Sequence, residues 1–164
     1  MSEDRTLDVL KQAILLERQG KAFYEQVAHH SQSAAVADFF RVMAEEEAEH
    51  EQVLSAQFSS YAGAGRLVEA PESAGSAVSQ VLGQDIRSQI SAASYEAAAI
   101  SAAIDMENRA VKVYSERADA ADDPREQQLY RWLVQWEKGH LKFLADINAE
   151  LLEDVWNENN FWPF

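Results

Sequence analysis

Two pairs of residues have the spacing expected for metal ligands on a helix. Each pair is a Glu followed three positions later by a His, at Glu47 and His50 and again at Glu137 and His140. Residues three apart lie on the same face of an α-helix, so one carboxylate and one imidazole can bind one ion together. This donor set suits iron, manganese, cobalt or zinc better than calcium or magnesium. The spacing therefore predicts two helices that each carry a pair of transition-metal ligands.

Further residues accompany each pair at matching distances. A Glu lies 30 positions before each pair, at Glu17 and Glu107, and a Tyr follows each of these Glu by seven positions, at Tyr24 and Tyr114. A single Glu-x-x-His pair is a weak signal in so acidic a chain, whereas the repeated set is hard to obtain by chance. The six Glu and His side chains are therefore the candidate metal ligands.

Four long helices are predicted to position these residues. Apolar side chains recur at spacings of three and four, and the few Gly and Pro gather in two places, which favours helices elsewhere. The predicted helices are 6–30, 34–59, 92–121 and 124–154. The segment 61–90 is predicted to be a long crossover with a short helix near 78–86. Two antiparallel hairpins joined by a crossover make an all-α four-helix bundle.

The two hairpins are internal repeats. A shift of 90 residues superimposes them without a gap, placing Glu17 on Glu107, Glu47 on Glu137 and His50 on His140. Two such hairpins can face each other about a pseudo-twofold axis, which brings the middles of all four helices together. Four buried carboxylates repel one another strongly, so we expect two metal ions between them, with iron first and manganese or zinc as alternatives.

Composition narrows the class of protein. The chain has 164 residues, a formal net charge of −14 and no cysteine. The charge argues against nucleic-acid binding and against anionic membranes, and the missing cysteines exclude thiolate metal sites and disulfides. No signal sequence or apolar run of about 18 residues is recognised, so we expect a cytoplasmic protein.

The chain is predicted to hold one domain and a tail. Residues 1–154 form the bundle, and residues 155–164 are rich in Trp and Phe. We expect this tail to pack on the bundle or across a dimer, with docking to a separate partner as the alternative.

The constellation resembles the ferritin-like superfamily, and most closely the rubrerythrin branch. The resemblance covers residues 6–152 and rests on the two Glu–Tyr pairs and the two Glu-x-x-His pairs. It implies a non-haem di-iron centre ligated by the six side chains, with Glu47 and Glu137 as bridges. It also implies that Tyr24 and Tyr114 hold ligand carboxylates through their hydroxyl groups, although both could equally be ordinary core aromatics.

The resemblance further implies an activity. Members of the family oxidise Fe(II) with hydrogen peroxide or oxygen, as peroxidases or ferroxidases in oxidative stress, and commonly form homodimers. Without cysteine the chain has no rubredoxin-like iron, so an external electron donor is needed. Ala110 stands where rubrerythrins carry an additional Glu, and with Gly20 it is expected to leave space for the oxidant.

Two other functions stay open at this stage. The bundle could sequester iron or another divalent ion without catalysis, or it could dock a partner while metals only stabilise the fold. Two further features have simple structural interpretations: His29 and His30 are expected to cap a helix end, and the run Glu45–Glu51 is expected to be a solvated face with one inward Glu. Metal entry is the alternative for the histidines, and attraction of iron for the acidic run.

Overall fold

Helices make up almost all of the part of the chain that the structure describes. The computed structural model describes residues 3–72, 85–90 and 95–159, and no β-strand occurs in these ranges. The elements are α1 (Glu3–His30), α2 (Ala34–Ala64), α4 (Asp85–Ser88), α5 (Tyr95–Ala120) and α6 (Pro124–Asn159). The predicted all-α four-helix bundle is confirmed.

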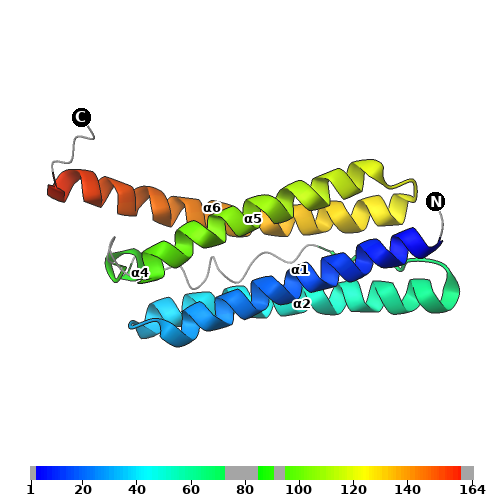
Figure 1. Cartoon of the computed structure of the whole chain (residues 1–164), viewed down its shortest axis with the longest axis horizontal. Helices are drawn as coiled ribbons and strands as arrows, with labels where there is room; N and C mark the ends of the chain where they lie inside the picture. The colour runs from blue at the N-terminus through cyan, green and yellow to red at the C-terminus, as the bar shows by residue number, and fades with distance from the viewer. Residues whose placement is uncertain (1–2, 73–84, 91–94, 160–164) are drawn as a thin grey trace.

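The four long helices form two antiparallel hairpins. α1 packs along α2, and α5 packs along α6. The two hairpins lie against each other as two layers, and the N-terminal end of α1 lies at the same end of the bundle as the turn between α5 and α6 (Figure 1). This arrangement brings the middle of each helix to the centre of the molecule.

Local sequence explains where the helices begin. The Ser33 side chain accepts a hydrogen bond from the backbone N–H of Val36 at the start of α2. Asp123 Oδ1 accepts from the Arg125 N–H, and Pro124 occupies the first position of α6, where its missing N–H costs nothing.

Two helices extend beyond their predicted ends. α2 continues past residue 59 and through Gly63 to Ala64; it ends at Gly65, which adopts a left-handed φ of 65° and donates its N–H to Tyr61 O at 2.8 Å. α6 continues past residue 154 to Asn159. The crossover therefore starts later than residue 61. Most of the predicted helix 78–86 lies outside the described residues, as does the end of the tail, 160–164.

The first part of the crossover is anchored to both hairpins. The Gln57 amide on α2 exchanges two hydrogen bonds of 3.0 Å with the backbone of Val68. Arg125 on α6 donates to Leu67 O at 2.8 Å, and the Leu67 side chain is buried. The chain leaving α2 is thus held against α6.

Two apolar clusters fill the bundle on either side of its middle. One contains Tyr24 stacked on Phe40 at 6.1 Å, and the other contains Tyr114 stacked on Tyr130 at 6.2 Å. A shift of 90 residues converts the first pair into the second, so the packing repeats as the sequence does. Both clusters stop at the polar residues of the helix middles.

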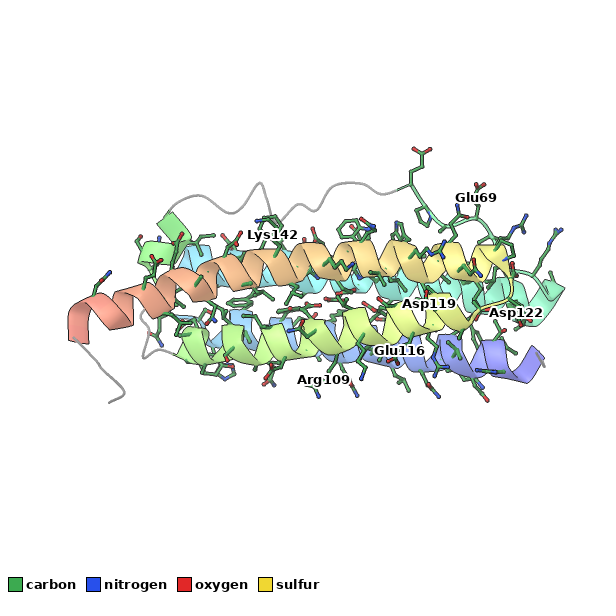
Figure 2. All side chains as sticks on the ribbon, turned by 90° about the horizontal axis from the view of Figure 1, so that it is seen from above. Glu69, Arg109, Glu116, Asp119, Asp122 and Lys142 are labelled. Carbon is green, nitrogen blue, oxygen red and sulfur yellow. The ribbon has the colours of Figure 1, made fainter. Side chains whose placement is uncertain are left out.

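Charged side chains cover the outside. Figure 2 shows Arg109 and Glu116 on the outside of α5 and Lys142 on the outside of α6. His29 and His30 are exposed at the end of α1, in keeping with the predicted cap, and His30 Nδ1 lies 2.9 Å from Gln26 O. None of the helices in the described ranges is long and apolar enough to cross a membrane.

Core and surface leucines of α1 allow a direct test of this packing. Leu10 is fully buried, whereas the Leu15 side chain is 56% exposed. We expect Leu10→Ala to lower the free energy of unfolding by about 2–5 kcal/mol. Leu15→Ala should change it by less than about 0.5 kcal/mol. Urea unfolding measures both, and equal losses would contradict the assignment of the core.

Candidate metal centre

Each long helix contributes to a buried polar layer in the middle of the bundle. α1 and α5 each supply one Glu, while α2 and α6 each supply one Glu and one His, one helical turn apart. All six residues are at most 3% exposed. They are Glu17, Glu47, His50, Glu107, Glu137 and His140. These are the six residues whose spacing suggested metal binding.

The six side chains form two overlapping groups. The first consists of Glu17, Glu47, His50 and Glu137, and the second replaces Glu17 and His50 with Glu107 and His140. In each group one ligand atom from every residue lies within 4.8 Å of the others. Because Glu47 and Glu137 belong to both groups, each can contact two ions at once, which is the position that bridging carboxylates need.

The imidazole Nδ1 atoms face the carboxylates in both groups. His50 Nδ1 lies 3.1 Å from Glu17 Oε2 and 3.1 Å from Glu137 Oε1. His140 Nδ1 lies 3.3 Å from Glu47 Oε1 and 3.5 Å from Glu107 Oε1. The nitrogen on each ring that could bind an ion is therefore Nδ1.

The two tyrosines connect the hairpins. Tyr24 on α1 donates its hydroxyl to Glu107 Oε1 on α5, and Tyr114 on α5 donates to Glu17 Oε1 on α1. Each tyrosine thus holds a carboxylate of the opposite hairpin while its ring packs in the core. Hydrogen bonding and core packing, which the sequence left as alternatives, occur together.

Gly20 gives room to a carboxylate. A Cβ atom at this position would lie 3.3 Å from Glu47 Cδ, closer than most such contacts. Sequence reasoning assigned Gly20 and Ala110 to space for an oxidant. In the structure, the space beside Gly20 is taken by Glu47.

Burial and mutual repulsion divide the carboxylates into two kinds. The pKa values of Glu17 and Glu107 are raised by desolvation and by repulsion from Glu137. Desolvation opposes ionisation of Glu47 and Glu137 too, but the neighbouring imidazoles of His140 and His50 outweigh it and lower the pKa values of both carboxyl groups. In the metal-free protein, two carboxylates are favoured as ions and two as neutral acids.

The imidazoles complete this balance of charge. Desolvation works to lower the pKa values of His50 and His140, but the surrounding carboxylates raise them well above the ordinary value. The raised values favour the imidazolium form, whose positive charge opposes that of the ionised carboxylates without metal. Two divalent ions would do the same for four carboxylates while displacing the protons.

Two buried polar atoms of the candidate ligands show whether these residues are suited to binding a metal ion. Within the described ranges, His140 Nδ1 and Glu137 Oε1 are buried without a hydrogen-bond partner of acceptable geometry. Such atoms are costly unless something binds them. Imidazole nitrogen and carboxylate oxygen around one point are ligands for a transition-metal ion, so the site fits one.

Sequence reasoning missed three residues behind the histidines. Glu46 Oε2 lies 2.6 Å from His140 Nε2, and the rings of Trp132 and Trp136 lie 5.5 and 5.2 Å from the His50 ring. The prediction of a single inward Glu in the run Glu45–Glu51 is wrong, because Glu46 is buried as well. Its position four residues before His50 was a usable signal, hidden by the acidic residues around it.

The fold and the site together define a four-helix bundle with a buried carboxylate–histidine cluster that could hold metal, the ferritin-like class. The rubrerythrin family model matches residues 8–148, and the chain belongs to the rubrerythrin family. Comparisons with curated proteins and with solved structures found no match.

The raised pKa values predict how the metal-free protein responds to pH. His50 and His140 contribute stability that is complete below the unfolded pKa of about 6.5 and is lost as pH rises through their folded values. The stability from Glu17 and Glu107 is complete below about pH 4.3 and is likewise lost as pH rises. We therefore expect the thermal midpoint with chelator present to fall between about pH 6 and pH 9.

Two comparisons make this measurement specific. Glu47 and Glu137, with lowered pKa values, act in the opposite sense and lose their contribution only in acid. The metal-loaded protein should not show the alkaline loss, because deprotonated ligands bind metal better. The variant His29→Gln/His30→Gln, which removes two exposed histidines, should keep the loss. A flat midpoint in the metal-free protein would contradict the proton-balanced network.

Proposed function

We propose that this protein is a non-haem di-iron oxidoreductase that oxidises an Fe(II) pair with hydrogen peroxide or oxygen. The observation that carries the proposal is the overlap of two four-residue groups through Glu47 and Glu137. Two sites that share two carboxylates hold their ions close together, and paired ions can exchange two electrons with one oxidant. Membership of the rubrerythrin family supports iron as the metal.

Each residue has a definable part in such a site. Glu17 and His50 would bind one ion, Glu107 and His140 the other, and the shared carboxylates both. Two bound Fe(II) ions would supply two electrons, each ion becoming Fe(III), which with two protons from solvent reduce one hydrogen peroxide to two waters.

The surrounding residues prepare this site. Tyr114 donates to Glu17 Oε1 and so leaves Oε2 of that carboxylate facing His50. The apolar clusters on both sides restrict access of bulk water, which strengthens the electrostatic interactions inside. The chain therefore supplies charge, orientation and a dry environment.

Electrons to restore Fe(II) must come from outside the chain. No cysteine is present, so none of its residues can build a rubredoxin-type iron centre. A separate donor, a reduced redox protein or cofactor, is proposed for repeated turnover. Non-catalytic sequestration of iron differs from this proposal in having no turnover.

Removal of the shared carboxylates tests the proposal. Fe(II) is added without oxygen, then peroxide, and remaining Fe(II) and peroxide are measured. We expect the wild-type protein to consume one peroxide for each Fe(II) pair, faster than free Fe(II) does. Glu47→Gln/Glu137→Gln should fall to the rate of free Fe(II), because neither pair of ligands is complete. Glu45→Gln/Glu49→Gln is the matched control, since both residues are exposed on α2.

Turnover separates catalysis from sequestration. With ascorbate present as reductant, an oxidoreductase consumes peroxide repeatedly. A protein that binds two Fe(II) but stops after one round, or never reacts faster than free Fe(II), would be a sequestering protein and the proposal would be wrong.

A further inference from the structure

The two histidines of the centre differ in what lies behind them. His140 Nε2 is 2.6 Å from Glu46 Oε2, and Glu46 is only 4% exposed. His50 Nε2 is also buried but has no hydrogen-bond partner among the described residues. Trp132 and Trp136 instead present their rings edge-to-face to the His50 ring. Trp136 also lies edge-to-face to the His140 ring, at 6.4 Å, so the difference between the two histidines is the carboxylate at His140 Nε2.

This difference interrupts the internal repeat. The shift of 90 residues that matches every candidate ligand and both tyrosines places Glu46 on Trp136. Glu46 on α2 reaches the histidine of α6, and Trp136 on α6 reaches the histidine of α2. The two halves of the centre thus have the same ligand types but different support.

A carboxylate behind a metal-binding imidazole has known physical effects. It accepts the Nε2–H, which fixes the tautomer that leaves Nδ1 free for the ion, and it orients the ring and makes it a better donor. Glu46 also adds negative charge beside the His140 half of the centre. Among the described residues, the buried Nε2 of His50 has no such partner and gains none of these effects.

We propose that the two metal positions are inequivalent. The position of Glu107 and His140 fills first and binds its ion more tightly, and Glu46 is the positioning residue that makes it so. The position of Glu17 and His50 fills second. This inference rests on the proposed function only in requiring that the centre holds two ions.

Titration of the metal-free protein with Co²⁺ tests the inference without measuring activity. Native mass spectrometry counts the ions per chain, and competition with a chelator gives the affinity of each step. We expect two separate steps in the wild-type protein. Glu46→Gln should weaken the first step by about 10- to 100-fold and leave the second unchanged. Glu45→Gln, the same change at the exposed neighbouring residue, should alter neither step.

Two histidine variants test the order of filling without changing Glu46. His140→Ala should abolish the tighter step, and His50→Ala should abolish the weaker one. Circular dichroism of each metal-free variant checks that the helices are retained.

The outcomes distinguish the inference from the proposed function. Two equal steps in the wild-type protein, or loss of the tighter step in His50→Ala, would overturn the inequivalence and leave the paired metal site standing. Weakening of the second step by Glu46→Gln would overturn the role of Glu46. A wild-type protein that binds no Co²⁺ would overturn both this inference and the proposed metal centre.

Discussion

The burial of four carboxylates in the middle of a helical bundle is the constraint on which the rest of this structure depends. Ionised together and unpartnered, they would cost more than the surrounding apolar packing could offset. In the metal-free chain the pKa values of both histidines and of Glu17 and Glu107 are raised, which favours retained protons at this layer, and the same side chains form the ligand groups that could hold metal. Protons and metal therefore compete for one set of atoms, and the fold must hold that set in place in either state.

The internal repeat provides a simple way to hold it. Each hairpin brings two carboxylates and one imidazole, and each extends a tyrosine hydroxyl to a carboxylate of the other hairpin. The stacked ring pairs Tyr24–Phe40 and Tyr114–Tyr130 place apolar packing on both sides of the polar layer. The two hairpins therefore contact each other through the candidate ligands and the tyrosines that hold them. The same residues contribute to the stability of the bundle and to the site. Glu46 and Trp136, which the shift of 90 residues superimposes, depart from this symmetry. Glu46 pairs with His140 Nε2, whereas Trp136 packs against the His50 ring.

In this member of the rubrerythrin family, six side chains supply both of the overlapping groups that could hold metal. Ala110 stands at the position where the resemblance implied an additional carboxylate, so that carboxylate is missing from this chain. The absence of cysteine separates the proposed oxidation, which the bundle can host, from the supply of electrons, which it cannot. The proposed oxidation in the centre and the proposed reduction by a separate donor can therefore be tested separately.

Spacing along the chain determined the helices, the hairpins and the six clustered side chains, because helical periodicity is local and the shift of 90 residues repeats it. It could not determine which groups meet across hairpins. Tyr24 with Glu107, Glu46 with His140 and Gly20 against Glu47 each join residues on different helices, and their contact depends on the rotation and separation of packed helices. The end of α2 at Gly65 required only local propensity, whereas the inward turn of Glu46 within an acidic run required the tertiary structure, since only α6 brings the imidazole that pairs with it.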